Sequence, residues 1–445
     1  MTARYPRSLK SLDPPASVRE IVARLERAGH ETWCVGGAVR DALLGHTHLD
    51  WDLATAATPD QVMKIFRRTV PVGVEFGTVG VLDDAQVMHE VTTFRRDVRT
   101  DGRHAVVEFG AKLDDDLARR DFTINAIAYH PKTEEIRDPF EGRLDLQRGV
   151  VRAVGVAEDR MREDRLRALR AIRFASRFGF HIEPATWRAI TGSAPHLGRL
   201  SAERVKEELR KTMEQVERPS VALEFWRTCG ALRQLVPAVA DAPPERFAAL
   251  DFLARAENRE PAAADPRGLT LDRLSMLFFG EDERTALAAT RALKFSNADS
   301  GWIAKLAGAR HALGNAMDRA IWSGDPPDAE VRRWVAAVGR TRTDAFLALS
   351  VALWTARLAE QADPAVSARL APSAERAARI AFHDPIELAD LAVDGEDLGS
   401  VGIPPGPAVG RVLQQLLDRV VEDPAQNTRD GLLENARRLA AAKAP

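Results

Sequence analysis

The sequence predicts an α+β protein, in which a mixed sheet with helices is followed by an elongated all-helical region. Short runs with alternating apolar residues, separated by Gly and Asp turns, dominate between residues 32 and 109, as expected for strands. From residue 158 onward the apolar positions recur every three to four residues, as in amphipathic helices. The 445 residues are enough for roughly three domains with their own cores.

Each expected element rests on one of these two periodicities. The expected strands are 32–35, 49–54, 78–82, 87–94 and 106–109. The helices expected to cover one face of the sheet, or to precede it, are 15–28, 39–44, 59–67 and 122–129. The first helices of the later region are 158–178, 183–193, 202–217 and 219–229. Ala- and Pro-rich stretches predict loops or linkers at 242–244, 261–266 and 361–372.

Composition limits the class of protein only weakly. The 63 Lys and Arg residues are balanced by 65 Asp and Glu, so total charge neither indicates nor excludes a nucleic-acid partner. Locally, residues 148–211 hold 15 Lys/Arg against 8 Asp/Glu, an excess that fits either a phosphate-binding track or a solvated helical surface. Two cysteines, no apolar leader and no long apolar run predict a soluble cytoplasmic protein.

The stretch 34–55, CVGGAVRDALLGHTHLDWDLAT, combines a Gly-Gly turn with two carboxylates. Side chains alternate between the faces of a strand, so Asp50 and Asp52 are expected to project the same way. Two such carboxylates repel each other unless a cation lies between them. Magnesium held by one or two carboxylates plus substrate phosphates is such a cation, and a Gly-Gly turn brings backbone N–H groups close to a phosphate. We therefore expect Asp50 and Asp52 to be Mg²⁺ ligands.

Together with this stretch, four other segments carry a resemblance to a known family. The segments are 35–55, 90–95, 119–128, 163–180 and a C-terminal part around 391–412. They resemble the class II nucleotidyltransferases, which include bacterial CCA-adding tRNA nucleotidyltransferases and bacterial poly(A) polymerases. The resemblance implies a polymerase-β-like nucleotidyltransferase head. It also implies Mg²⁺-dependent addition of C, C and A to tRNA 3′ ends from CTP and ATP, without a template.

The resemblance also suggests a division of the chain into four parts. They are a catalytic head over 1–148, a helical neck with the base-reading helix over 149–218, a helical body over 219–330 and a tRNA-holding tail over 331–445. Within the head, Glu90 of HEVTTF matches the third catalytic acid that joins Asp50 and Asp52. A salt-bridge or edge-strand role for Glu90 fits its position equally well.

Further matches concern the triphosphate and the sugar. Gly37 and Arg40 match positions that contact the triphosphate, and a guanidinium suits a phosphate because it donates two parallel hydrogen bonds. Arg120 of RRDFTINAIAY matches an arginine at the nucleotide, and Asp121 is placed to contact a ribose hydroxyl. Two local alternatives stay open, because Arg40 next to Asp41 fits a surface ion pair and RRD at a helix start fits capping.

The segment 163–174, EDRLRALRAIRF, is expected to read the base. At about 100° per residue, Asp164, Arg167 and Arg170 share one helix face, while Arg173 falls in the apolar arc. The resemblance implies that Asp164 accepts the amino group of cytosine or adenine and that Arg167 donates to the adjacent ring nitrogen. Uracil and guanine present the reverse order of donor and acceptor, and a bidentate contact discriminates by roughly 1–3 kcal/mol. Arg170 and Arg173 match further nucleotide-contacting positions.

Several alternatives remain at this stage. A poly(A) polymerase is the first, although the segment 70–82 lacks the basic run typical of those enzymes. The loop DGRH at 101–104 has His104 where CCA-adding enzymes carry a second arginine, so a partial enzyme that adds only CC or only A is the second. A catalytically idle RNA-binding protein is the third. The sequence does not decide between a monomer and a homodimer.

Overall fold

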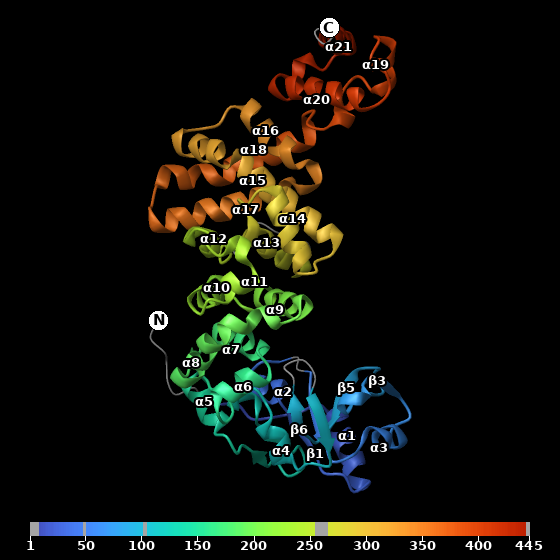
Figure 1. The fold of residues 1–445 in the computed structure, drawn as a ribbon, viewed down its shortest axis with the longest axis vertical. Helices are drawn as coiled ribbons and strands as arrows, with labels where there is room; N and C mark the ends of the chain where they lie inside the picture. Colours follow the sequence, from blue (N-terminus) through green and yellow to red (C-terminus); the bar gives the residue numbers. More distant parts are fainter. Residues whose placement is uncertain (1–8, 48–49, 101–104, 254–265, 442–445) are drawn as a thin grey trace. The chain divides into compact units, whose positions relative to one another are not determined.

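The computed structural model describes residues 9–47, 50–100, 105–253 and 266–441 (Figure 1). The chain forms two compact units. The first comprises Met1–Glu208 and Phe225–Leu235, and the second comprises Leu209–Glu224 and Val236–Pro445. The sheet lies in the first unit and the second unit is helical, which confirms the predicted α+β class. The four-part division of the chain stays a prediction.

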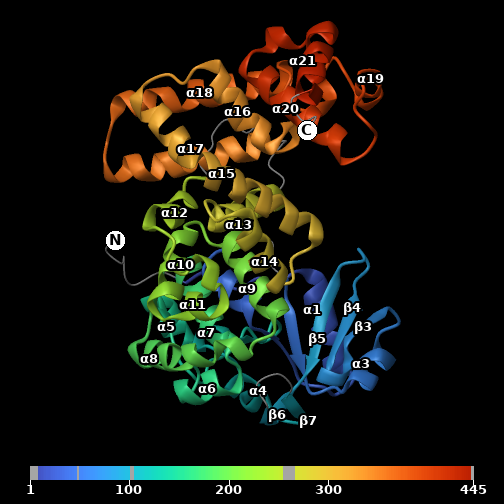
Figure 2. The same cartoon turned by 45° about the horizontal axis from the view of Figure 1, so that its top comes forward.

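The first unit is built on a seven-stranded mixed sheet. Its strands, in spatial order, are β3 (Thr69–Gly73), β4 (Thr78–Leu82), β5 (Met88–Thr93), β2 (Asp52–Thr55), β1 (Thr32–Val35), β8 (Ala128–Tyr129) and β9 (Ile136–Arg137). Only the central pair, β2 and β5, is parallel, and the other neighbours are antiparallel. Figure 2 shows β3, β4 and β5 side by side. The central parallel pair is where the carboxylates discussed below originate.

Helices and a hairpin complete the head around this sheet. The elements are α1 (Ala16–Arg27), α2 (Gly37–Leu43), α3 (Pro59–Ile65), the hairpin β6 (Arg95–Thr100) and β7 (Ala105–Phe109), α4 (Leu113–Ala118) and α5 (Gly142–Arg148). A core cluster joins strand residues Trp33 and Ala54 to Leu117 of α4 and to Phe94. Burial of these apolar side chains contributes about 25 cal/mol per Å². The residues next to them on the same strands are thereby held in fixed positions.

The segment 122–129, expected to be a helix, is not one. It begins with a single 3₁₀ turn, η2 (Thr123–Asn125), and continues as strand β8. Phe122, Ile124 and Ile127 are completely buried, and the polar residues Thr123 and Asn125 are buried as well. The segment is thus apolar all round with satisfied polar groups, rather than amphipathic. A helix-like spacing of apolar residues is not specific for a helix when both sides are buried.

The long helix expected over 158–178 is interrupted. The chain forms α6 (Ala157–Glu163) and α7 (Leu166–Phe178), with Asp164 extended between them at φ −147° and ψ 106°. The Asp164 carboxylate accepts a hydrogen bond of 3.0 Å from the Leu166 N–H at the start of α7. An Asp that bonds backbone two residues ahead competes with helix continuation. The helical wheel that placed Asp164 on one face with Arg167 was therefore wrong for Asp164.

The second unit consists of helices, and the boundary between the units falls inside α9 (Ala202–Gln215) and α10 (Pro219–Thr228). The remaining helices of the first unit are α8 (Pro184–Ser193) and α11 (Ala231–Leu235). Those of the second are α12 (Pro244–Ala249), α13 (Pro266–Phe278), α14 (Glu283–Ala292), α15 (Asn297–Ser323), α16 (Asp328–Val338), α17 (Arg340–Glu360), α18 (Pro364–His383), α19 (Gly395–Ser400), α20 (Pro407–Glu422) and α21 (Arg429–Ala441). The loop expected at 361–372 is wrong, because α18 runs through Pro372. Among the described helices, none is long and apolar enough to cross a bilayer.

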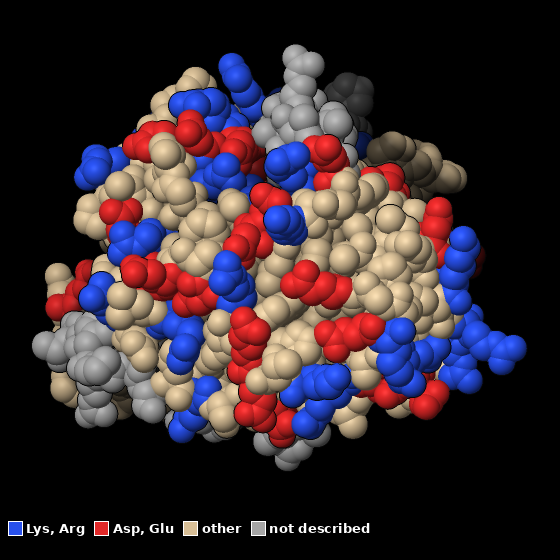
Figure 3. All heavy atoms as spheres, turned by 90° about the horizontal axis from the view of Figure 1, so that it is seen from below, with Lys and Arg blue, Asp and Glu red and all other residues tan. Residues whose placement is uncertain are grey.

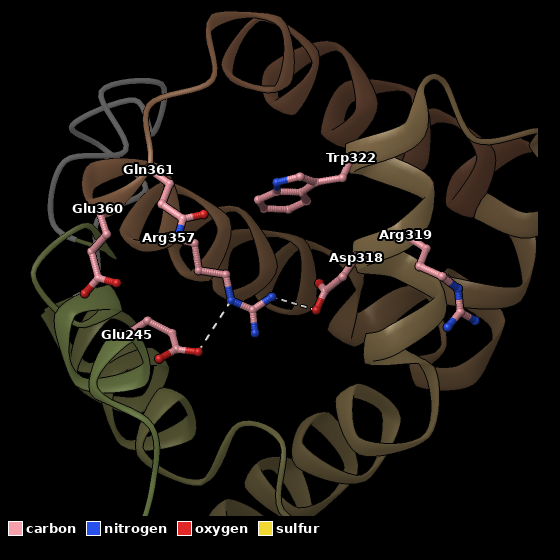
Figure 4. Close-up of a pocket in the computed structure, with 7 residues that line it drawn as sticks. All are labelled: Glu245, Asp318, Arg319, Trp322, Arg357, Glu360 and Gln361. Atoms are coloured by element: carbon pink, nitrogen blue, oxygen red, sulfur yellow. Dashed lines mark hydrogen bonds and ion pairs between the residues drawn. The ribbon is translucent and has the colours of Figure 1, made fainter.

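A partly buried carboxylate, 22% exposed, joins helices α15 and α17 of the second unit. Asp318 of α15 accepts hydrogen bonds from Arg310 (2.8 Å), from Trp354 Nε1 (2.7 Å) and from Arg357 (2.6 Å) of α17. Figure 4 shows Arg357 pointing into a cavity of about 470 Å³, where it lies between Asp318 and Glu245 of α12. Burial alone would raise the pKa of Asp318, but the Arg310 charge and these hydrogen bonds hold that pKa below its ordinary value.

Replacing Asp318 by Ala should lower the free energy of unfolding of the second unit by about 3–5 kcal/mol, because Arg310 would be left as an unpaired buried charge. Urea unfolding followed by circular dichroism measures this loss. Asp344→Ala is the matched control, since Asp344 is an exposed acid on the same helix as Arg357 and should change stability by less than about 0.5 kcal/mol. Equal effects of the two substitutions would contradict the role given to Asp318.

Candidate active site

At the centre of the sheet, the charges of two predicted acidic residues, Asp50 and Glu90, act on a third, Asp52. In the parallel pair β2–β5, Leu53 lies opposite Val91, so Asp52 and Glu90, one residue earlier on each strand, face the same way. Burial and the negative charges of Glu90 and Asp50 raise the pKa of Asp52 to about 6, even though the positive charge of Arg120 opposes this. Like charges are therefore concentrated around a partly buried carboxylate, as expected where a cation binds.

The geometry differs from the sequence prediction in one respect. Strand β2 begins at Asp52, so Asp50 precedes the strand, and residues 48–49 lie outside the described residues. The prediction that alternation along one strand aligns Asp50 with Asp52 is therefore wrong, because Asp50 is not on the strand. Asp50 is nevertheless close enough for its charge to act on Asp52.

The donor set fits a hard divalent cation. In the described part of the chain, no three His, Cys, Asp or Glu side chains converge closely enough to enclose a metal by themselves. An ion of the Mg²⁺ type does not need such a cage, because it binds through one or two carboxylates and completes its shell with water and substrate phosphates. Carboxylate oxygens are its preferred protein ligands. Asp52 carries such oxygens, with the charges of Asp50 and Glu90 close enough to act on it, and the role of Asp50 and Asp52 as metal ligands stays a prediction.

A close approach joins the Gly-Gly turn to these acids. Strand β1 pairs Val35 with Asp52, and the chain then turns at Gly36 with φ +75° into α2. A Cβ atom on Gly36 would lie 2.8 Å from Arg120 Nη1 and 4.0 Å from Asp52 Oδ2. The turn therefore has to be glycine for conformational and steric reasons. Gly37, the next residue, begins α2, and the first N–H groups of a helix are available to an anion.

Arg120 is held in place while part of its guanidinium stays available. It donates to the Asp116 carboxylate at 3.1 Å and to the Asn125 carbonyl oxygen at 3.3 Å. Its Nε is buried and has no hydrogen-bond partner in the described part of the structure. Burial without a partner is costly for a charged donor. The atom that faces the Gly-Gly turn is Nη1, and a phosphate oxygen at the turn would accept from it, so Arg120 suits its predicted role.

Arg40, predicted to contact the triphosphate, is buried in this structure. It donates from Nε to Asp41 at 2.6 Å and from Nη1 to Asn125 Oδ1 at 2.6 Å. Its guanidinium also lies over two aromatic rings of α7, those of Phe174 and Phe178, at 4.8 and 5.0 Å from the ring centroids. The surface ion pair considered for Arg40 is wrong, because both Arg40 and Asp41 are buried. Direct contact of Arg40 with a nucleotide stays a prediction.

The contacts of Arg40 continue through the head in both directions. Arg177 donates to Asp41 at 3.1 Å on one side. On the other, Asn125 donates to Asp121 at 2.9 Å, and Asp121 accepts from Arg170 at 2.8 Å. Further along, Glu208 of α9 lies 4.0 Å from Arg170 and accepts from Arg173 at 2.8 Å. We call this series the ion-pair chain, and its members are Arg177, Asp41, Arg40, Asn125, Asp121, Arg170, Glu208 and Arg173.

Within the ion-pair chain, several predicted residues have internal partners. Burial alone would raise the pKa of Asp121, but the Arg170 charge and the hydrogen bonds from Asn125 and Arg170 hold it below its ordinary value. Arg173 is buried, as its position in the apolar arc predicted, and its partner Glu208 is buried too. The structure therefore places Asp121, Arg170 and Arg173 in the wall of the site. Their contacts with a nucleotide stay predictions.

The two residues expected to read the base lie at the start of α7. Asp164 accepts from Leu166 N–H and, at 2.7 Å, from Arg204 of α9. Arg167 donates to Glu163 at 2.7 Å and to two backbone carbonyl oxygens, those of Arg160 and Arg119. These contacts use three of the five N–H donors of Arg167. Both side chains are thus oriented before any nucleotide binds, and their base-reading role stays a prediction.

Sequence reasoning missed three groups that support the site, namely Asp116, Asn125 and Arg204. Asp116 is completely buried and binds Arg119 and Arg120 at spacings of three and four residues, a local pattern that LDDDLARR displays. Asn125 is buried inside INAIA, where a polar residue in an apolar run is itself a signal. Arg204 contacts Asp164 across 40 residues, and nothing in a single sequence indicates that pair.

The local excess of arginine in 148–211 has a largely internal explanation. Eight of these arginines pair with carboxylates of the first unit, and two of them, Arg152 and Arg162, do so with side chains that are 42% and 69% exposed. The other six have side chains at most 34% exposed, and they are Arg160, Arg167, Arg170, Arg173, Arg177 and Arg204. On the face drawn in Figure 3, basic and acidic side chains are intermixed, without a broad area of one sign. Neither of the two earlier readings, a phosphate track or a solvated helix surface, accounts for these six residues.

Three domain models match the chain, and their ranges include the site. Residues 32–152 match the Poly A polymerase head domain. Residues 179–247 match the "Probable RNA and SrmB- binding site of polymerase A", and residues 347–436 match tRNA nucleotidyltransferase domain 2. The head-domain match contains the acid cluster, the Gly-Gly turn and Arg120. The fold and the site together define a nucleotidyltransferase.

Similar proteins narrow this class to one family. The CCA-adding enzyme of Lactiplantibacillus plantarum is 33% identical over 441 residues, which cover 96% of this chain and 97% of that protein. The crystal structure of the Bacillus stearothermophilus CCA-adding enzyme in complex with CTP matches with a TM-score of 0.68 and 32% identity, over 97% of this chain and 100% of that one. The Thermotoga maritima CCA-adding enzyme complexed with tRNA, at 21% identity and a TM-score of 0.63, shares the fold. The chain belongs to the CCA-adding enzyme family.

Gly36→Ala should lower kcat/KM for CTP by at least about tenfold, because the new methyl group displaces Arg120 from the turn. Gly29→Ala is the matched control. Gly29 has φ +87°, but a methyl group at this position would have no described atom within 4 Å. Both variants carry a similar backbone strain of roughly 1–3 kcal/mol, and only Gly36→Ala affects Arg120. Thermal melts and steady-state kinetics separate the two effects. Full activity of Gly36→Ala would contradict the close approach.

The raised pKa of Asp52 predicts a pH-dependent stability in chelator-treated protein. The pKa of Asp52 is about 6 in the folded protein against an ordinary 3.8. The protonated Asp52 carboxyl therefore contributes to the free energy of unfolding fully below pH 3.8, and this contribution is lost as the pH rises through 6. Above pH 6, Asp52→Asn should therefore be more stable than the wild type by up to about 3 kcal/mol, at about 1.4 kcal/mol per pKa unit. Urea unfolding between pH 4 and pH 8 measures the difference. A difference independent of pH would exclude this explanation.

Proposed function

We propose that the protein is a CCA tRNA nucleotidyltransferase that adds C, C and A to tRNA 3′ ends from CTP and ATP. It works without a nucleic-acid template and depends on Mg²⁺. The observation that carries the proposal is the convergence of Asp50, Asp52 and Glu90 beside the Gly36 turn and Arg120. The family supports it, because relatives over nearly the whole chain are CCA-adding enzymes and one solved relative is in complex with CTP.

Bond formation would take place at the acid cluster. Asp50 and Asp52 would hold Mg²⁺, with Glu90 as a third acid, and the bound cation would supply activation of the attacking hydroxyl and stabilisation of the leaving pyrophosphate. Arg120 would donate to the triphosphate, and the N–H groups at Gly37 would approach it from the turn. Together, these residues would fix the α-phosphate in line with the 3′ hydroxyl group of the RNA.

Base choice would take place at the start of α7. The Asp164 carboxylate would accept the exocyclic amino group of cytosine or adenine, while Arg167 donates to the neighbouring ring nitrogen. Uracil and guanine place a carbonyl against the carboxylate and an N–H against the guanidinium, which leaves buried groups unpaired. Arg40, Arg170 and Arg173, which all belong to the ion-pair chain, would complete the nucleotide site.

The cellular setting follows from the partners. An enzyme that acts on tRNA with CTP and ATP would work in the cytoplasm. Cys34 and Cys229 are both free and buried, which supports a reducing compartment. Burial raises the pKa of the Cys34 thiol to about 12, so it is not a reactive group at neutral pH.

Incorporation assays with each of the four nucleoside triphosphates test the proposal, using tRNA that ends before the first C, after one C or after both. The expected products gain C, C and A, then stop, and Asp50→Ala abolishes every addition. Long A tracts on unrelated RNA would indicate a poly(A) polymerase instead, and arrest after CC a partial enzyme. Absence of any incorporation by the wild type would overturn the proposal. The loop at 101–104, which bears on the A-adding step, lies outside the described residues.

A further inference from the structure

Helix α9 supports the base-reading segment through two side chains one helical turn apart. Arg204 and Glu208, at positions i and i+4, share one face of this helix. Arg204 donates from Nη2 to Asp164 Oδ2 at 2.7 Å, and Glu208 accepts from Arg173 of α7 at 2.8 Å. One face of α9 thus binds Asp164, two residues before α7 begins, and Arg173 in the middle of α7.

We propose that Arg204 is a positioning residue that sets the discrimination of C and A against U and G. The inference rests on the proposed function, in which Asp164 accepts the amino group of the incoming base. Arg204 itself does not touch the nucleotide in this account. It acts by fixing the direction in which the Asp164 carboxylate offers its remaining lone pairs.

The hydrogen bonds of Asp164 explain why a second anchor is needed. Asp164 lies in an extended link between α6 and α7, so no helix surrounds it. Leu166 N–H fixes Oδ1 at 3.0 Å, and Arg204 fixes Oδ2 at 2.7 Å. Two anchors on two oxygens define the plane of the carboxylate, whereas a single anchor leaves it free to rotate about χ2. Each oxygen has a second lone pair, so the anchored carboxylate can still accept an amino group.

The side-chain exposures allow a clean test of this role. Arg204 and Asp164 are 34% and 28% exposed, respectively, so removal of Arg204 should cost little stability. The acid cluster, the Gly36 turn and Arg120 are held by other contacts, such as those of Arg120 with Asp116 and Asn125. Loss of Arg204 should therefore change which base is chosen far more than the ability to form the bond.

The experiment compares Arg204→Ala with Arg210→Ala in the full chain. Arg210 lies on the same helix and forms an ion pair of 2.8 Å with Glu214 at similar exposure, 41% and 40%. The measurement is kcat/KM for CTP, UTP, ATP and GTP on tRNA lacking its 3′ CCA or only its final A. We expect Arg204→Ala to lower the CTP/UTP and ATP/GTP ratios by about tenfold, as a loosened positioning group does. Arg210→Ala should leave both ratios unchanged.

Two further variants keep the outcome decisive. Arg204→Lys retains the charge but offers a point donor, so it should restore the ratios only partly. In an Asp164→Ala background, Arg204→Ala should cause no additional loss of discrimination, because its effect passes through Asp164. Unchanged ratios in a folded Arg204→Ala protein, or an equal loss in the Asp164→Ala background, would overturn the inference. If the wild type itself fails to prefer C and A, the proposed function fails instead, and the two failures are distinguishable.

Discussion

The ion-pair chain is the interaction on which the rest of the head depends. It starts at Arg177 of α7, passes through Asp41 and Arg40 of α2 and then through Asn125 and Asp121, and ends at α7 and α9. Because its members are mostly buried, each charge needs the next one as a partner, and removing any link would leave a buried charge uncompensated. This requirement fixes α2 and its Gly-Gly turn relative to α7, although more than a hundred residues separate them in the sequence.

The ion-pair chain therefore holds two sets of functional residues at a fixed distance from each other. The acids on β2 and β5 and the Gly36 turn form the part that suits a metal and a triphosphate. The start of α7, with Asp164 and Arg167, forms the part that suits a base edge. Asn125 lies between the two parts, because its backbone carbonyl accepts from Arg120 and its side-chain amide donates to Asp121. A nucleotide would span the two parts, with its phosphates at one and its base at the other.

The sequence predicted the elements whose pattern is local. Strand Thr32–Val35, strand Thr78–Leu82 and helix α1 follow directly from alternation or amphipathic spacing. Two predictions failed where burial or a single side chain overrode the pattern, namely the supposed helix at 122–129 and the uninterrupted helix through Asp164. The long-range partners of Arg40, Asp164 and Arg173 could not be predicted from the sequence either. They are Asn125, Arg204 and Glu208, and each pair joins residues 35 to 85 positions apart. A pattern read along the chain carries no information about such contacts.

The central claim is that bond formation and base choice are carried out by separate groups of one rigid site. A crystal structure of the chain with Mn²⁺ and a non-hydrolysable CTP analogue tests it most directly, because anomalous scattering locates the metal independently of the nucleotide. The account predicts manganese on Asp52, with the phosphates at Gly37 and Arg120 and the cytosine edge on Asp164 and Arg167. A cytosine edge bound elsewhere, or a metal away from Asp52, would contradict it.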